Sequence, residues 1–226
     1  MDISILILIP TMIFALYAQF KVSSTFRKYS QTGNRQGLTG ADVARRLLDS
    51  SGMTDVRVEH VRGELTDHYD PRDKTVRLSD SVYGSTSVAA LGVAAHEAGH
   101  AMQHDIGYAA LGIRNSLLPV AGLGSKLALP LIIIGFLLAS AGGMMLVYIG
   151  IIMFTAVAAF QIITLPVEFD ASSRALELLE GNRFLTEDEI IPARRVLNAA
   201  ALTYVAAVAV TLAHLLRFVM MASHRR

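Results

Sequence analysis

Two histidines and a glutamate in the middle of the chain stand at a spacing that could carry metal chemistry. His96, Glu97 and His100 form the pattern His-Glu-x-x-His. On a helix, residues four apart point the same way, so both imidazoles can bind one zinc ion at about 2.0–2.1 Å through a ring nitrogen. Glu97 is turned by about 100° from His96 and lies beside the metal. There it can take a proton from a water molecule whose pKa zinc lowers towards about 7, which predicts Glu97 as a catalytic base.

The same pattern has a plainer alternative, a helix with two solvated or core histidines. The chain holds seven histidines among 226 residues, so chance would produce the pattern only about 0.01 times in such a chain. The pattern also falls on a predicted helix, as its chemistry requires. Gly99, inside the pattern, weakens a helix by about 1 kcal/mol and predicts that another element packs closely over it.

Zinc needs a third protein ligand from elsewhere in the chain. There is no cysteine, and Gln103 and Ile106 stand where a metzincin would continue its motif. Glu168 and Asp170 directly follow an apolar segment, where a polar helix begins. We expect Glu168 to be the third ligand, with a solvated carboxylate at a helix start as its alternative. Asp170 is expected to accept a hydrogen bond from a ligand imidazole, and it is the second choice as ligand.

Four further residues are candidates for the walls of a substrate cleft. His104 lies one more turn along the metal helix, where a surface or packing role is an equal alternative. His68 and Tyr69 precede a predicted strand and are candidates for stabilising an oxyanion. Arg174 could pair with Asp170 or with a substrate carbonyl, and its alternative is an interfacial salt bridge.

The overall composition of the chain that carries these residues is typical of a membrane protein. Apolar residues make up 53% of the chain, charged residues 17%, and the mean hydropathy is +0.46. A soluble domain carries roughly a quarter charged residues. The net charge of +1 gives no electrostatic argument for a nucleic-acid partner.

Apolar runs predict about four membrane spans, namely residues 3–20, two helices within 127–166 joined by a turn at 140–143, and residues 196–221. Residues 1–20 are expected to remain as an anchor, because the start is not basic and no clear cleavage site follows. A further apolar segment, 111–124, is expected to lie along the membrane surface or under the metal site.

Between the first two apolar regions lies a small soluble insert of mixed α and β structure. Its predicted elements are a helix over 41–50 capped by Thr39, strands over 56–61 and 75–78 around a turn at 67–73, and a helix over 85–105. The last helix carries the metal pattern, and Ser85 or Ser87 can cap it. The strand at 76–78 is expected to offer an edge to which an extended substrate peptide adds.

The chain therefore divides into five predicted segments: an anchor (1–20), a cytoplasmic α+β insert with the metal helix (21–110), a membrane-associated segment and hairpin (111–166), a cytoplasmic segment with the third ligand (167–195), and a last span with its tail (196–226). Two spans separate His100 from Glu168, so the two residues lie on one side of the membrane. Most basic residues beside the spans share that side, which the positive-inside rule places in the cytoplasm with both termini outside. The basic tail at 225–226 speaks against this orientation.

Four segments, well beyond the metal pattern, resemble a known family: DHYDP at 67–71, VRLS at 76–79, VAALGVAAHEAGHAMQH at 88–104 and LPVEFDAS at 165–172. They are similar to the YugP-like neutral zinc metallopeptidases, bacterial membrane proteases of the His-Glu-x-x-His type. The resemblance implies a multi-pass bacterial plasma-membrane protein, mainly α-helical, with a gluzincin-like insert in which Glu168 is the third zinc ligand. More distant membrane proteases carry Glu-x-x-x-Asp in the second motif, whereas this chain has Ser172. This departure favours Asp170 as the residue that orients the histidines.

The expected function is a membrane-embedded zinc endopeptidase that hydrolyses membrane or membrane-proximal proteins. Its partners would be a protein or peptide substrate, the lipid bilayer, and a regulatory membrane protein or a second copy of the chain. The alternative is a zinc-bearing scaffold without turnover, although such a scaffold has no use for a base at Glu97. A transporter is suggested only by His214 within the last span, and the hydropathy pattern has no paired broken helices.

Overall fold

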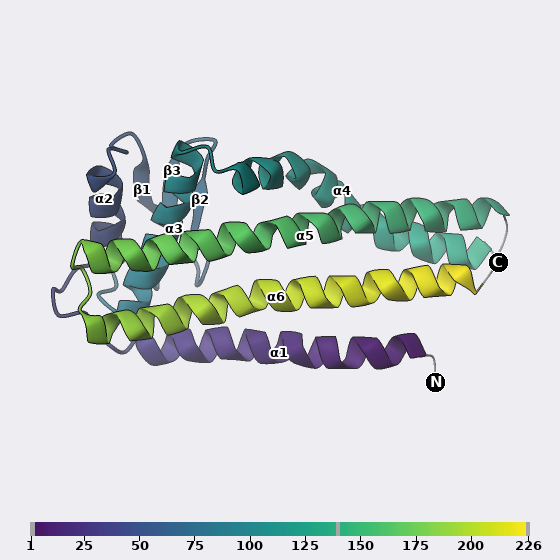
Figure 1. Cartoon of the computed structure of the whole chain (residues 1–226), viewed down its shortest axis with the longest axis horizontal. Helices are drawn as coiled ribbons and strands as arrows, with labels where there is room; N and C mark the ends of the chain where they lie inside the picture. Colours follow the sequence, from purple (N-terminus) through teal and green to yellow (C-terminus); the bar gives the residue numbers. More distant parts are fainter. Residues whose placement is uncertain (1–2, 139–140, 225–226) are drawn as a thin grey trace. The chain divides into compact units, whose positions relative to one another are not determined.

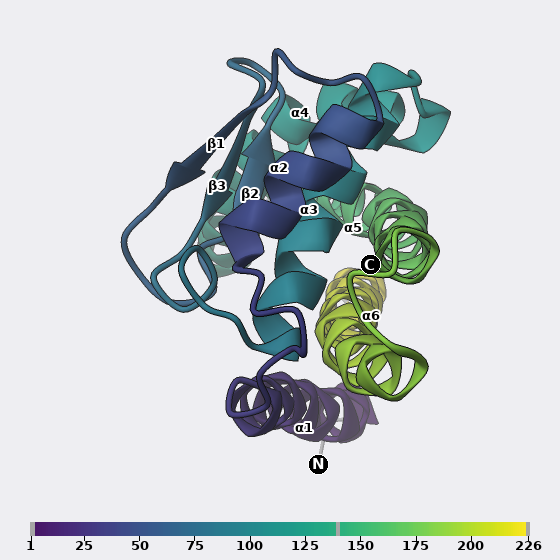
Figure 2. The ribbon, with the colours of Figure 1, turned by 90° about the vertical axis from the view of Figure 1, so that its left-hand side faces the viewer.

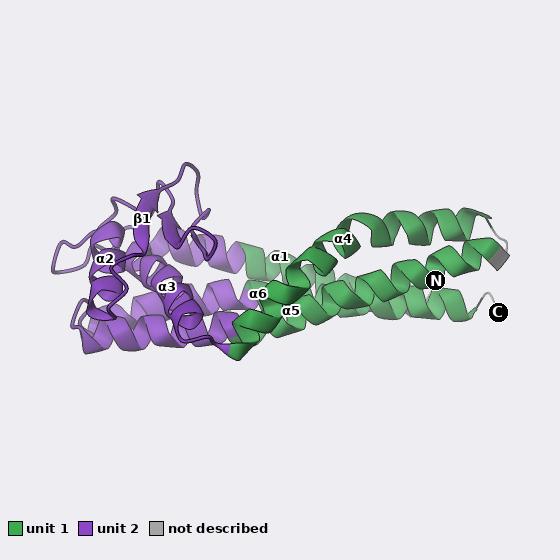
Figure 3. Ribbon diagram, turned by 90° about the horizontal axis from the view of Figure 1, so that it is seen from above, with its two compact units in different colours: residues 1–19, 109–166, 203–226 green, residues 20–108, 167–202 purple. Residues whose placement is uncertain are grey.

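The computed structural model describes residues 3–138 and 141–224, and it is mainly helical (Figure 1). Its elements are α1 (Ile3–Tyr29), α2 (Gly40–Ser50), β1 (Arg57–His60), β2 (His68–Asp70), β3 (Thr75–Leu78), α3 (Val88–Asp105), α4 (Ala109–Leu138), α5 (Ala141–Gly181) and α6 (Glu187–Ser223). They form two compact units, drawn in different colours in Figure 3. Unit 1 consists of Met1–Gln19, Ala109–Pro166 and Thr203–Arg226, and unit 2 of Phe20–Tyr108 and Val167–Leu202.

Four of the described helices are long and apolar enough to cross a membrane, in agreement with the predicted number of spans. They are Leu6–Tyr29, Ala109–Leu138, Gly142–Gly181 and Glu187–Ser223. Large apolar side chains on them face outward, and Leu16, Leu137 and Ile152 are 71%, 78% and 69% exposed. Exposure of this extent on apolar helices is what a lipid environment accommodates.

The hairpin in unit 1 begins earlier than its composition indicated. The segment 111–124, expected along the membrane surface or under the metal site, belongs to α4, which continues through Pro119 and Pro130. Of the predicted turn at 140–143, Ser140 lies outside the described residues and the remaining positions already belong to α5. The two helices approach closely through small residues, since a Cβ added at Gly150 would lie 2.8 Å from the carbonyl oxygen of Ala128. Small residues at helix contacts are typical of membrane bundles.

The start of α2, in unit 2, is fixed by the residues around it. Thr39 caps α2: its hydroxyl accepts a hydrogen bond from the amide of Asp42, whose carboxylate accepts one from the Thr39 amide in return. This reciprocal box satisfies two amides that a helix start leaves unpaired. Val43 and Leu47 are buried at helical spacing on the inner face. The expected helix and its cap are confirmed.

The three strands form one sheet in the order β1-β3-β2, which corrects two expectations. The predicted turn at 67–73 contains β2, which pairs antiparallel with β3, while β1 pairs parallel with it. The turn itself is shorter: the Arg72 amide donates to the Asp70 carboxylate, and Lys74 has a φ of 52°. Because β2 and β1 occupy both sides of β3, the strand at 76–78 is central and offers no edge to a peptide.

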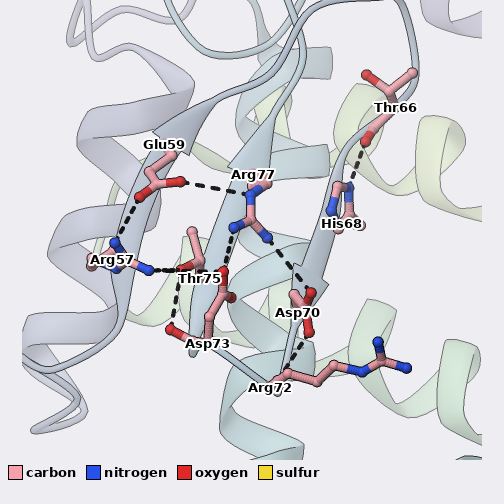
Figure 4. A network of polar contacts seen from close by, with 9 residues as sticks. All are labelled: Arg57, Glu59, Thr66, His68, Asp70, Arg72, Asp73, Thr75 and Arg77. Carbon is pink, nitrogen blue, oxygen red and sulfur yellow. Dashed lines mark hydrogen bonds and ion pairs between the residues drawn. The ribbon is translucent and has the colours of Figure 1, made fainter.

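The two faces of this sheet differ in chemistry. Helices α2 and α3 cover one face (Figure 2), on which Val76 and Leu78 are fully buried. The other face carries a charged network around Arg77 (Figure 4), which ion-pairs with Asp73, with Glu59 at 3.6 Å and with Asp70 at 3.7 Å. Exposed pairs of this kind add little free energy of folding each, so the buried face provides most of the stabilisation.

Helices α5 and α6 each combine an apolar stretch with a polar one. The sequence predicted a separate polar segment at 167–195 between two spans, but α5 runs unbroken through Pro166 to Gly181 and α6 runs from Glu187 to Ser223. Continuing a helix adds one hydrogen bond per residue, whereas starting a new one requires an unfavourable nucleus. The change in composition therefore alters only the surroundings of the helix and leaves its backbone intact.

Candidate metal site

Helix α3 presents the two histidines of the metal pattern side by side. Ser87 caps the helix by accepting a hydrogen bond from the amide of Ala90. One turn separates His96 from His100, and their ring centroids lie 4.6 Å apart with the planes at 81°. The side chains are only 14% and 13% exposed. Helical spacing thus places both imidazoles at one partly buried point.

Glu168, on the part of α5 that belongs to unit 2, completes a group of three. Its Oε2 lies 3.3 Å from His96 Nε2 and 3.7 Å from His100 Nε2, and its side chain is 5% exposed. Ligand atoms about 2.1 Å from one tetrahedral ion lie about 3.4 Å from one another. The three side chains therefore fit a zinc ion with three protein ligands and one remaining position, as in catalytic zinc sites.

Gln103, which the sequence did not mark as a site residue, orients His100. The Nδ1 of His100 lies 3.0 Å from Gln103 Oε1, while Gln103 Nε2 donates to Asp170 Oδ2 at 2.7 Å and to the carbonyl oxygen of Val167 at 2.8 Å. Two acceptors fix the amide group, so its oxygen must face His100 and accept from Nδ1–H. This tautomer leaves the lone pair of His100 on Nε2, beside Glu168. The spacing of three from His100 on one helix face was the available signal.

The other imidazole is held by the residue at which the chain departs from the more distant proteases. Ser172 Oγ lies 3.1 Å from His96 Nδ1. Asp170, expected to accept directly from an imidazole, instead accepts from Gln103 and from Arg174, whose Nε lies 2.6 Å away. Asp170 thus acts on His100 through Gln103, and Arg174 makes the carboxylate pair that the sequence suggested.

Close packing between α3 and α5 brings these residues together. A Cβ added at Gly99 would lie 2.9 Å from the carbonyl oxygen of Ala171. A side chain there would push α5 away, so the close approach requires a glycine. The expectation that another element packs over Gly99 is confirmed, and that element is the helix that carries Glu168.

Glu97 occupies a buried position next to the two histidines in sequence. Glu97 is 7% exposed. Burial raises the pKa of its carboxyl above the usual range, although the charges of both imidazoles act to lower it. Burial alone would lower the pKa of His100, but the hydrogen bond to Glu168 and the charge of Glu97 outweigh it and raise that pKa. Opposite charges therefore stabilise one another here in place of solvent.

The remaining cleft candidates separate into two groups. Tyr69 and His104 contact each other, with the Tyr69 hydroxyl 2.9 Å from His104 Nδ1, and burial raises the pKa of Tyr69 to about 12. Tyr69 lies on the α3 side of β2. Its neighbour His68 points to the opposite, charged face, where its Nδ1 lies 2.8 Å from the carbonyl oxygen of Thr66 (Figure 4). Because side chains alternate between the two faces along a strand, His68 and Tyr69 lie on opposite faces of the sheet, although both were expected in one cleft.

Two histidines one helical turn apart, a carboxylate as the third member of the group and four apolar helices point to a class of membrane zinc peptidases, and comparison with known sequences agrees. The chain belongs to the family described as "Putative neutral zinc metallopeptidase", whose model matches residues 4–223. This confirms the resemblance seen in the sequence.

Among individual proteins, the chain is similar to "Putative membrane protease YugP" of Bacillus subtilis (strain 168). The two are 51% identical over 206 residues, which cover 91% of this chain and 90% of the relative. No solved structure matches the chain. The family, the relative and the four apolar helices together indicate a membrane protein of a zinc peptidase family.

Proposed function

We propose that the protein is a membrane-embedded zinc metalloendopeptidase in which His96, His100 and Glu168 hold the metal. The observation that carries this proposal is the convergence of two Nε2 atoms and one carboxylate oxygen, with both Nδ1 atoms held by other side chains. A chance cluster of titratable groups would not need both imidazoles fixed in the orientation that points Nε2 at the same place.

When bound, zinc would polarise the scissile carbonyl and lower the pKa of water towards about 7. Glu97 then takes a proton from the attacking water and delivers it to the leaving amine. Burial, which raises the pKa of Glu97, brings that carboxyl closer to the operating pH of a general base. The carboxylate accepts no hydrogen bond from the described residues, so it can contact a water molecule.

The substrate would be an extended segment of a membrane or membrane-proximal protein, and we place it along β2. This strand is at the edge of the sheet, and among the described residues only β3 pairs with it. Tyr69 extends from β2 to His104 on the metal helix, one turn beyond His100. Backbone groups of such an edge can pair with an added peptide. β2 therefore replaces the central strand in the docking role first expected at 76–78.

We place the protein in a bacterial plasma membrane with the site on the cytoplasmic side. Two apolar stretches, α4 and the part of α5 before Glu168, lie between the metal helix and Glu168 along the chain. An even number of crossings returns the chain to the same side. Basic residues beside the spans favour the cytoplasm for that side.

The test compares the purified wild-type protein with a Glu97→Gln variant of equal zinc content. Both are incubated with casein and with an unfolded membrane protein, and fragments are measured. Cleavage should fall by about 10²–10⁴-fold in the variant, because the general base is lost while the ligands remain. Equal fragment yields from the two proteins would refute the enzyme and support a zinc-bearing scaffold.

A second pair of variants tests the ligand assignment. Glu168→Gln should lower zinc occupancy after dialysis, whereas Glu177→Gln, an exposed position on the same helix, should leave it unchanged. Asp170→Asn completes the comparison. If zinc is lost with Asp170→Asn and retained with Glu168→Gln, the third ligand is Asp170.

A further inference from the structure

A basic pocket of about 420 Å³ lies in unit 2, and it shares no residue with the metal-binding group. Its walls come from the last turns of α1 and the polar start of α6. Lys21, Thr25 and Lys28 recur at helical spacing on α1, and Arg195 and Asn198 do so on α6. Two helix faces that are about 170 residues apart in sequence therefore line one pocket, and both carry basic residues.

The charges around this pocket are all of one sign. Lys21, Lys28 and Arg195 line it, and none of its lining residues is acidic. None of the three cations has a salt bridge within residues 3–138 and 141–224. Like charges around a shared cavity repel, and an anion in the cavity would offset that repulsion.

Neutral groups complete the pocket and orient its cations. Arg195 Nη1 donates to the Tyr29 hydroxyl at 2.8 Å, and the Nζ of Lys28 lies 5.3 Å from the centroid of the same ring. Tyr29 and Thr25, which also line the pocket, are each only 8% exposed. The Tyr29 ring thus contacts both Lys28 and Arg195. Because Arg195 uses only one N–H group for this contact, its other N–H groups can donate to a ligand. Arginine beside lysine, with Asn198 at the rim, matches the oxygens of a phosphate.

The position of the pocket along the two helices indicates where that phosphate would come from. Lys21 is the first charged residue after the apolar run of α1, and Asn198 is the last strongly polar residue before the apolar run of α6. From Lys21 to Lys28 the helix rises about 10 Å. The headgroup layer on one side of a bilayer is about 5–8 Å thick, so the pocket spans its depth.

We propose that this pocket binds a phosphate group, and that an anionic lipid headgroup at the membrane surface supplies it. Basic pockets between membrane helices are suited to such headgroups. Free phosphate offers the same chemistry, and the two sources differ in whether an acyl chain is required. The inference is independent of the zinc site.

The experiment measures lipid retained by the full-length protein in detergent by native mass spectrometry, after addition of phosphatidylglycerol or phosphatidylcholine. A parallel arm adds inorganic phosphate alone and follows the thermal midpoint. The test variant is Lys28→Ala/Arg195→Ala. The matched control is Arg27→Ala/Arg194→Ala, which removes the same charge one residue away on each helix but outside the pocket. Circular dichroism establishes that both variants are folded.

Phosphatidylglycerol should be retained over phosphatidylcholine by the wild type and the control, and about tenfold less by the test variant, since each cation contributes severalfold. A thermal shift with inorganic phosphate, lost in the test variant only, would support the phosphate site and assign free phosphate as its source. The proposal is overturned if both double variants lose lipid equally, or if the wild type holds neither phosphatidylglycerol nor phosphate. An unfolded test variant is replaced by Lys28→Gln/Arg195→Gln, to which the same criteria apply.

Discussion

Each imidazole of the candidate site has one nitrogen held by a side chain and the other turned towards Glu168. For His100 the partner is Gln103, and for His96 it is Ser172. Holding Nδ1 in this way fixes the ring and leaves Nε2 able to bind a metal. Two neutral residues therefore do what a carboxylate does in many zinc sites, and zinc affinity should depend on both.

The contact between Ser172 and His96 can be tested with its neighbour as a control. Ser172→Ala removes the hydroxyl 3.1 Å from Nδ1, and we expect zinc affinity to fall about tenfold. Ser173→Ala, at an exposed position one residue on, should leave affinity unchanged. Competition with a chelator measures both. Equal affinity in the two variants would mean that Ser172 does not orient the ring.

Gln103 has more contacts to lose. Gln103→Met keeps the side-chain length but leaves His100 Nδ1 without an acceptor. It also removes the bond from Gln103 to the Val167 carbonyl and one of the two donors that pair with Asp170. We expect a drop of about 10–100-fold in zinc affinity and a loss of about 1–3 kcal/mol in the free energy of unfolding. His104→Ala, one position along the helix, should retain zinc, because its contact is with Tyr69. Zinc loss of the same size in His104→Ala would contradict this role for Gln103.

Among the elements, the contact of α3 with α5 decides the geometry of the site. Glu168 is 68 residues from His100 in sequence, and it reaches the histidines because a glycine at position 99 lets the two backbones approach. A second glycine on α3, Gly92, faces α6 at ordinary distance, with an added Cβ 3.6 Å from that of Ala193. The two positions provide a matched pair on one helix.

Gly99→Ala should separate α5 from α3, lower zinc affinity and destabilise the fold by about 1–3 kcal/mol through overpacking. Gly92→Ala should leave zinc affinity unchanged and be neutral or stabilising by up to about 1 kcal/mol, since alanine favours helix. Zinc titration and thermal unfolding in detergent distinguish the two. If both variants bind zinc like the wild type, the Gly99 contact does not set the position of Glu168.

For the molecule as a whole, the proposal requires both metal-binding segments on one side of a membrane. The chain has no cysteine, so single introduced thiols report on topology without background. Glu64, Glu180 and Ser223 are exposed positions in the insert, at the end of α5 and at the end of α6. Their placement follows from the number of spans between them.

A membrane-impermeant maleimide should label Ser223→Cys in intact bacterial cells, and Glu64→Cys and Glu180→Cys only after the cells are permeabilised. Parity of the spans and the positive-inside rule give this expectation. The reverse pattern would correct the orientation alone. Labelling of Glu64→Cys and Glu180→Cys from opposite sides would exclude a site shared by α3 and α5.

Local features of this protein could be predicted from its sequence. The facing imidazoles of His96 and His100 follow from the helical period, the cap at Thr39 from a reciprocal hydrogen bond over three residues, and the four spans from the length of apolar runs. All three depend on interactions within a few turns of chain. The change from apolar to polar composition misled the prediction at α5 and α6, because composition reports the surroundings of a helix and not its end.

Tertiary structure alone decided the contacts between distant segments. It made His68–Asp70 a strand, put β3 at the centre of the sheet, and brought Gln103 and Asp170 together. It also joined Tyr29 to Arg195 across 166 residues and so formed the basic pocket. Such pairings depend on which faces pack together. A single sequence shows which face of each element is apolar, but it does not show which other element packs against that face. The sequence therefore determined the residues that can hold a metal, and packing determined their orientation.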